Sequence, residues 1–186
     1  IARYQSKKQG GNSDQDILHI PFYRGTHSLD PIYISRRTES HIASYLYSNL
    51  LRLDPQTNTY EGDLAIDWKR EAQRWHFTLR KGLKFHDASS LDAYGVKAHF
   101  ERLKVANHQN RHLFACIQQV EVLDPLRLVF HMRSMTAYLP ALLTNSAAGI
   151  TKAVNQDGQE SVIGSGSFVL NEQNNWLTRL TVFKHY

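Results

Sequence analysis

The sequence has a single cysteine, Cys116, among 186 residues, which excludes an internal disulfide framework. Cys116 lies in the apolar stretch 113–117, and this setting predicts a buried, unreactive thiol rather than a nucleophile. No stretch approaches the roughly 20 consecutive apolar residues of a membrane-spanning helix. Residues 1–15 are polar and basic with no apolar segment behind them, so they do not look like a signal peptide. These absences favour a protein without disulfides that does not span a membrane.

Motifs of catalysis and metal binding are also missing. The sequence contains no phosphate-binding loop, nucleophile elbow or paired-carboxylate motif, so an enzyme has no positive support. Among ten histidines, His108 and His112 have i, i+4 spacing, but no cysteine or acidic residue accompanies them at ligand-like spacing. The neighbours His86 and Asp87 are expected to form a hydrogen-bonded structural pair. We therefore expect no catalytic residue, no metal site and no cofactor.

The composition fits one domain, or one large lobe of a bigger protein. Hydrophobic residues make up 41% of the chain and aromatic residues 11%, which is enough to form a buried core. Lysine and arginine number 22 against 17 aspartate and glutamate, giving a net charge of +5 and a pI near 9.4. This mild excess permits an anionic ligand or nucleic acid but requires neither.

Residues 1–16 read as a linker, because 4–16 form a polar run that contains two glycines. Together with the absence of an initiator methionine, this run predicts that another domain lies upstream. Residues 17–186 then form the folded part.

Strand and helix patterns alternate through residues 17–186. Apolar residues alternate at Leu18, Ile20 and Phe22, which predicts a first strand. Thr38 or Ser40 is expected to cap a helix that runs to Leu50. A capping box is expected at 89–92, before a helix whose buried stripe is Ala93, Val96, Phe100 and Leu103. Further along the chain we expect two strands joined at Asp124-Pro125, a short helix at 138–143 and a hairpin at 167–183. The interleaving without an internal repeat predicts a mixed α/β fold.

The most informative run is 75–87, Trp-His-Phe-Thr-Leu-Arg-Lys-Gly-Leu-Lys-Phe-His-Asp. Its alternation of apolar and polar residues predicts a strand, a turn and a second extended piece. The order of residues in this run resembles a motif of family 5 of the extracellular solute-binding proteins, which includes oligopeptide, dipeptide and nickel receptors. Further matches are Leu29-Asp30-Pro31, residues 45–54, Asp63-Leu64-Ala65 with Trp68, and residues 163–168. Ala88 and Tyr94-Gly95 depart from the family pattern and suggest a divergent branch.

A narrower resemblance indicates which branch. Residues 20–24 and 35–41 are similar to the sugar-phosphate-stress transcriptional regulators of the SgrR type. Such regulators join an upstream winged-helix DNA-binding domain to a cytoplasmic family 5 domain. The resemblance implies a periplasmic-binding-protein-like type II fold whose two lobes close on a ligand. Residues 17–186 would then be most of lobe one, with the second lobe absent from this sequence.

Three groups of residues are candidates for ligand binding. Tyr23 and Arg24 follow the first strand, and the planar fork of arginine suits phosphate or carboxylate, although a surface cation beside a packed tyrosine explains them as well. Arg36 and Arg37 could add positive charge, with Glu39 and His41 orienting them, although a solvated helix start explains them as well. Ser165 and Gly166 could present bare N–H groups to an anion, although a tight structural turn is the alternative.

These observations predict a ligand-sensing, non-catalytic domain of a cytoplasmic transcriptional regulator. Its ligand would be a small solute, such as a sugar or a sugar phosphate, and it would reach DNA only through the missing upstream domain. The alternative is a receptor that delivers oligopeptides to an ABC-type importer, because the run at 75–87 is common to both.

Overall fold

The computed structural model describes residues 17–18, 26–106, 108–134, 137–156, 158–174 and 177–186. The expected linker at 1–16 and most of the expected first strand lie outside these ranges. The elements are β1 (Ile17–Leu18), η1 (Pro31–Tyr33), α1 (Arg37–Leu46), β2 (Leu51–Asp54), β3 (Thr59–Gly62), β4 (Ala65–Glu71), β5 (Arg74–Leu79), α2 (Ala93–Val105), η2 (Arg111–Phe114), β6 (Ile117–Asp124), β7 (Arg127–Met132), α3 (Leu139–Leu143), η3 (Ser146–Ala148), β8 (Lys152–Gln156), β9 (Gln159–Ile163), β10 (Phe168–Gln173) and β11 (Thr178–Val182).

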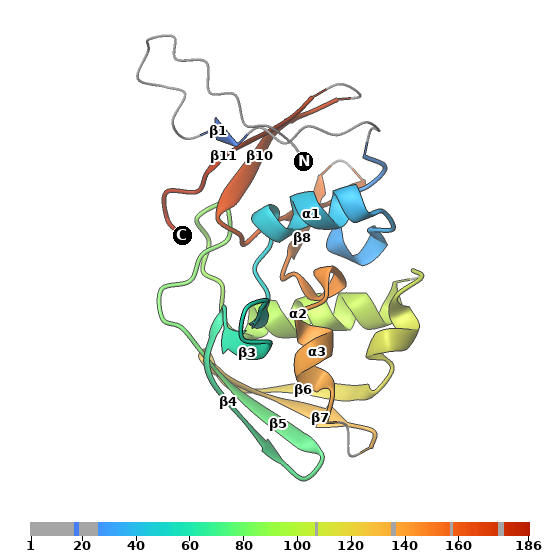
Figure 1. The fold of residues 1–186 in the computed structure, drawn as a ribbon, viewed down its shortest axis with the longest axis vertical. Helices are drawn as coiled ribbons and strands as arrows, with labels where there is room; N and C mark the ends of the chain where they lie inside the picture. The colour runs from blue at the N-terminus through green and yellow to red at the C-terminus, as the bar shows by residue number, and fades with distance from the viewer. Residues whose placement is uncertain (1–16, 19–25, 107, 135–136, 157, 175–176) are drawn as a thin grey trace.

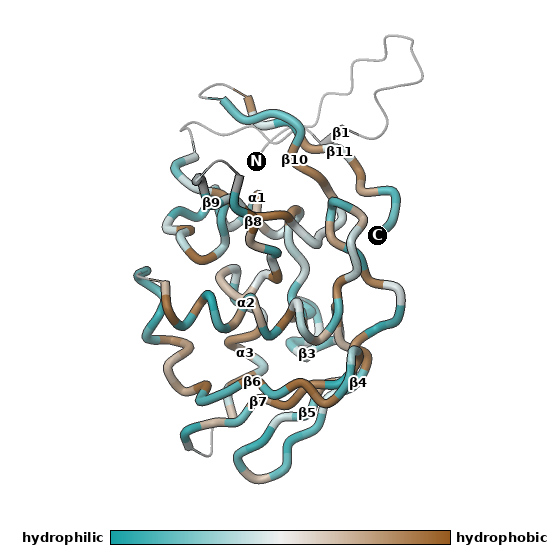
Figure 2. The backbone as a smooth tube through the Cα atoms, turned by 180° about the vertical axis from the view of Figure 1, so that it is seen from behind, coloured by the Kyte–Doolittle hydropathy of each residue, from teal (hydrophilic) through white to brown (hydrophobic). Residues whose placement is uncertain are grey.

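The larger layer is an antiparallel sheet with strand order β4-β5-β7-β6, and α2 and α3 cover one of its faces (Figure 1). The predicted strand in the 75–87 run is confirmed as β5, in which Trp75, Phe77 and Leu79 are buried. Phe77 packs edge-on against Phe130 of β7, with ring centroids 5.4 Å apart. Figure 2 shows the apolar stretches of the chain along β5 and β7, beneath the helices.

Helix α2 packs on this sheet through the predicted stripe. Ala93, Val96, Phe100 and Leu103 are all fully buried, as expected. The predicted capping box is wrong in its register. Asp92 itself is the N-cap, because its Oδ1 accepts the N–H groups of Tyr94 and Gly95.

The second layer is the three-stranded sheet β1-β11-β10, which lies beside α1 (Figure 1). The expected caps Thr38 and Ser40 are wrong, since α1 starts after Arg36. The expected end at Leu50 is also wrong: the backbone turns extended at Tyr47, directly after Leu46. Leu50 is nevertheless buried, so its place in the apolar pattern reflects the core and not the helix.

The other predicted elements are largely confirmed. The short helix is α3, the strands around Asp124-Pro125 are β6 and β7, and the tail hairpin is β10 and β11. The hairpin of β8 and β9 was not expected, because its strands are mostly polar. Over the ranges that the structure describes, no helix is both long enough and apolar enough to cross a bilayer.

Candidate functional site

The start of α1 carries two of the predicted binding residues, Arg36 and Arg37, and both side chains are exposed. His108 and Gln109, which follow α2, contact the segment just before α1. The rings of Tyr33 and His108 meet edge-on at 6.4 Å, and the Gln109 side-chain amide donates to the carbonyl of Ile34 at 3.0 Å. The structure therefore brings two distant basic segments together.

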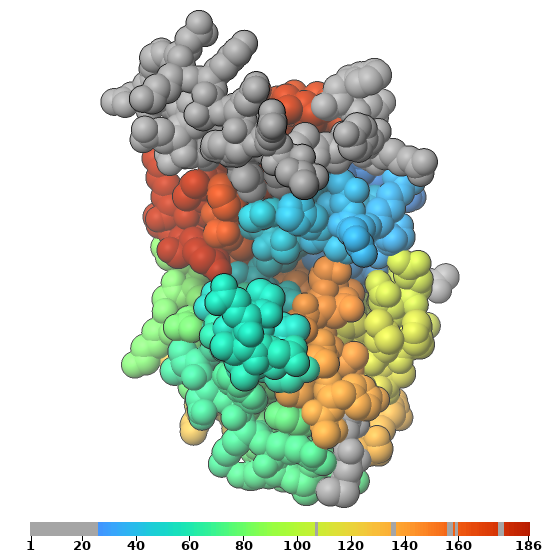
Figure 3. Space-filling model, in the orientation of Figure 1, coloured from blue at the N-terminus to red at the C-terminus, as the bar shows by residue number. Residues whose placement is uncertain are grey.

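A third segment, η3, completes this region. The hydroxyl of Ser40 in α1 lies 3.3 Å from that of Ser146 in η3. Figure 3 shows the blue start of α1, the yellow segment after α2 and the orange segment of α3 and η3 meeting on one face. We use the name α1 surface for one group of residues in this region. It consists of Tyr33, Arg36, Arg37, His108 and Arg111. Guanidinium groups beside a helix N-terminus favour an anionic group.

Glu39 stabilises the backbone of this region rather than orienting the arginine side chains, so that expectation is wrong. It is only 1% exposed, and its two carboxylate oxygens accept four backbone N–H groups. The donors are His27, Ser28, Ser35 and Arg36. Burial alone would raise the pKa of Glu39, but the four N–H groups outweigh it and lower the pKa. The carboxylate thus ties the segment before α1 to the helix.

Ser165 and Gly166 do not present bare N–H groups, because both donate to the carbonyl of Leu46 at 3.2 and 2.9 Å. The Ser165 hydroxyl is buried and donates to Ile150 at 2.7 Å. These residues therefore form a structural junction at the C-terminal end of α1. Arg36 and Arg37 lie at the other end, roughly 15 Å away along a ten-residue helix. Tyr23 and Arg24 lie outside the described residues.

Other expectations about polar residues have mixed outcomes. His86 and Asp87 do not bond to each other: His86 Nε2 lies 3.0 Å from the Gly166 carbonyl, and Asp87 binds Lys152 and Ser89. Cys116 is only partly buried, and burial raises the pKa of its thiol. Across the described ranges, no three His, Cys, Asp or Glu side chains are grouped to hold a metal ion.

No pattern in the sequence indicated His99, which is buried beside η3. Its Nδ1 lies 2.9 Å from the Thr151 hydroxyl and 3.3 Å from the Thr151 N–H, which donates to it. Nδ1 is therefore the acceptor, so the neutral ring carries its proton on Nε2. Burial disfavours the charged ring and lowers the pKa of His99 to about 4.

We expect this histidine to make the protein less stable in mild acid. The unfolded chain takes up a proton near pH 6.5 and the folded chain only near pH 4, so stability is lost as the pH falls between these values. The shift corresponds to roughly 3 kcal/mol. Urea unfolding at several pH values should show a shallower dependence in His99→Gln, whereas the exposed control His112→Gln should keep the original slope. An unchanged slope in His99→Gln would contradict the assignment.

A comparison with protein-family models matches residues 59–186 to the bacterial extracellular solute-binding proteins, family 5 (middle region). The chain belongs to this family. The matched residues include the 75–87 run, which resembles the family most clearly, and the junction at Ser165 and Gly166.

The curated proteins that are similar to this chain are longer than it is. The uncharacterized protein YbaE of Escherichia coli K12 is 28% identical over 94% of this chain but only 30% of its own length. The HTH-type transcriptional regulator SgrR of the same strain is 30% identical over 68% of this chain and 22% of its own length. The chain therefore spans less than a third of these relatives.

Solved structures show that this chain has the fold of one part of a type II periplasmic binding protein. A substrate-binding protein of an ABC transporter from Sinorhizobium meliloti superposes with a TM-score of 0.77 at 23% identity, covering 88% of this chain and 35% of that one. The murein tripeptide binding protein MppA of Escherichia coli gives a TM-score of 0.75 at 20% identity, with 86% and 36% coverage. The predicted family and fold are thus confirmed.

Proposed function

We propose that this chain is the ligand-sensing part of a cytoplasmic transcriptional regulator. Its family binds solutes, and relatives near 30% identity bear the name of an HTH-type regulator. Residues 17–186 would form most of lobe one, and a second lobe would close over the ligand. Closure would alter the activity of an upstream winged-helix domain, since a ligand shifts an equilibrium by its differential affinity for the two states.

The observation that carries the ligand class is the α1 surface. Its arginines come from two segments that lie far apart in the sequence, and Tyr33 adds an aromatic ring, over which the Arg102 guanidinium lies at 5.9 Å from the centroid. Such a surface suits a small solute with both a ring and an anionic group, such as a sugar phosphate. Tyr23 and Arg24 remain predicted contributors to the same ligand. Ser165 and Gly166 would act indirectly, by holding the end of α1.

The second candidate is a receptor for an oligopeptide importer. It is supported by the fold match to MppA, a tripeptide-binding protein. The gene itself distinguishes the two. A basic winged-helix pattern encoded upstream of Ile1 supports the regulator, whereas a signal peptide there supports the importer.

A binding measurement tests the ligand class. In the full-length gene product, Arg37→Ala should weaken glucose 6-phosphate binding by roughly tenfold or more, because a charge-assisted hydrogen bond is lost. Calorimetric titration measures this, with Arg70→Ala as the control: Arg70 is an exposed arginine on β4. Equal affinities in wild type and Arg37→Ala would remove Arg37 from the site. Binding of trialanine without glucose 6-phosphate binding would favour the importer.

A further inference from the structure

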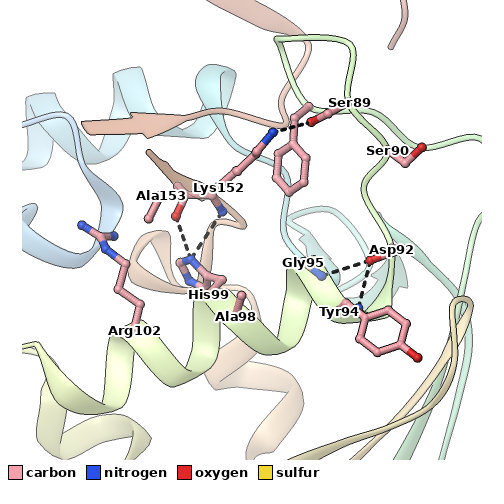
Figure 4. Close-up of a pocket in the computed structure, with 12 residues that line it drawn as sticks. Ser89, Ser90, Asp92, Tyr94, Gly95, Ala98, His99, Arg102, Lys152 and Ala153 are labelled. Carbon is pink, nitrogen blue, oxygen red and sulfur yellow. Dashed lines mark hydrogen bonds between the residues drawn. The ribbon is translucent and has the colours of Figure 1, made fainter. Parts of the chain in front are cut away.

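A hollow lies between α2, the start of β8 and the loop before α2. Its volume is about 380 Å³, within the range of small-ligand sites. We call it the α2–β8 groove. Figure 4 shows α2 along one side, with Lys152 and Ser89 on the opposite side. Its lining is Phe85, Ser89, Ser90, Asp92, Tyr94, Gly95, Ala98, His99, Arg102, Thr151, Lys152 and Ala153.

The floor of the groove is apolar and low, because glycine and alanine residues form it. Gly95 and Ala98 leave the surface of α2 low, and Ala153 does the same on β8. A Cβ at Gly95 would lie only 3.2 Å from the ring of Phe85, so this glycine allows helix and ring to approach closely. Phe85 covers Gly95, so the exposed Ala98 and Ala153 are the part of the floor that can receive the C–H face of a flat ring.

The basic side chains that line the groove, Lys152 and Arg102, already have acidic partners within the protein. Lys152 Nζ lies 2.8 Å from Asp87 Oδ2 and 3.0 Å from the Ser89 hydroxyl. Burial would raise the pKa of Asp87, but the hydrogen bonds from Lys152 and Ser89 outweigh it and lower the pKa to about 2. Arg102 is paired with both Asp30 and Glu160. An anionic ligand would have to compete with these ion pairs for Lys152 and Arg102, so an uncharged ligand fits better.

Hydrogen-bonding capacity is left over on both sides. Asp92 uses Oδ1 to cap α2, and its Oδ2 has no partner among the described residues. The Lys152 ammonium has three protons and two partners. One acceptor and one donor on opposite sides of the same groove suit hydroxyl groups at two positions of one ring, one donating to the carboxylate and the other accepting from the ammonium.

We propose that the α2–β8 groove binds a small uncharged ring bearing several hydroxyls, that is, a monosaccharide or cyclic polyol. The ring would lie between Ala98 and Ala153, with hydroxyls reaching Asp92 on one side and Lys152 on the other. The groove and the α1 surface have no lining residue in common, although Arg102 of the groove lies 5.9 Å from the ring centroid of Tyr33. This proposal is independent of the proposed function and can fail separately from it.

Nuclear magnetic resonance titration of the 186-residue chain tests the proposal. D-glucose, D-fructose and myo-inositol serve as probes, and the backbone amides of Gly95 and Ala98 report binding. At least one probe should cause a saturable shift there. Ala98→Leu, whose larger side chain fills the space above the floor, should lower the affinity for that probe by roughly tenfold or more. Glu101→Leu is the matched control, because Glu101 is also an exposed position on α2 and does not line the groove, and it should leave the affinity unchanged.

A second variant guards against misfolding of Ala98→Leu. Lys152→Met removes the donor while keeping a long side chain, and it should also weaken the probe by several-fold. Failure of all three probes to saturate would overturn the proposal, as would wild-type affinity in both groove variants. Saturable shifts at Gly95 with glucose 6-phosphate or glycine, but with none of the three probes, would show a site for charged ligands and overturn it as well.

Discussion

Gly166→Ala is expected to destabilise the protein by roughly 3–5 kcal/mol, the largest effect that we expect of any single change. A Cβ at this position would lie 2.5 Å from the Leu46 carbonyl carbon and 2.5 Å from the Tyr45 oxygen. Both are backbone atoms and cannot rotate away. The segment would have to separate from α1, breaking the two hydrogen bonds that Ser165 and Gly166 donate to Leu46.

Gly82→Ala is the matched control for this measurement. Gly82 has a φ of 77°, which an alanine adopts with strain, but no atom lies within 4 Å of the position that its Cβ would take. The expected loss is about 1 kcal/mol. Urea unfolding of the two variants separates close approach from backbone strain. Similar losses in both would contradict the close contact between Gly166 and α1.

Much of the fold could be predicted because one face of each element is buried. Trp75, Phe77 and Leu79 alternate since β5 has one face on the core, and the stripe of α2 repeats with the helical period for the same reason. Such patterns depend only on local sequence. The family was predicted differently, from the resemblance of the continuous 75–87 run to a known family.

Features that depend on distant partners could not be predicted. Glu39 looked like a helix-start residue, yet its partners include His27, twelve positions away. His86 stood next to Asp87 in the sequence but contacts Gly166, eighty positions on. For the candidate site, the sequence indicated Arg36 and Arg37 but not the contact of their region with residues 108–112, which only the tertiary fold creates.

Replacing Glu39 by alanine is expected to cost roughly 3 kcal/mol or more. The change removes the buried carboxylate that accepts the N–H groups of His27, Ser28, Ser35 and Arg36. Each unsatisfied buried donor costs about 1–3 kcal/mol, and partial rearrangement recovers some of the total. Thermal unfolding measures the loss. Glu101→Ala is the control, since Glu101 is exposed and makes only a surface pair with Lys97 at 3.6 Å.

Glu39→Gln separates the charge from the hydrogen bonds. The amide keeps one carbonyl acceptor but turns an NH₂ group toward backbone donors, so we expect a loss between those of wild type and alanine. Because the folded state lowers the pKa of Glu39, its stabilisation is complete above the unfolded value of 4.5 and disappears as the pH falls through the folded value. The stability difference between wild type and Glu39→Gln should therefore shrink in acid. A difference that is constant with pH would show that the carboxylate charge does not hold the start of α1.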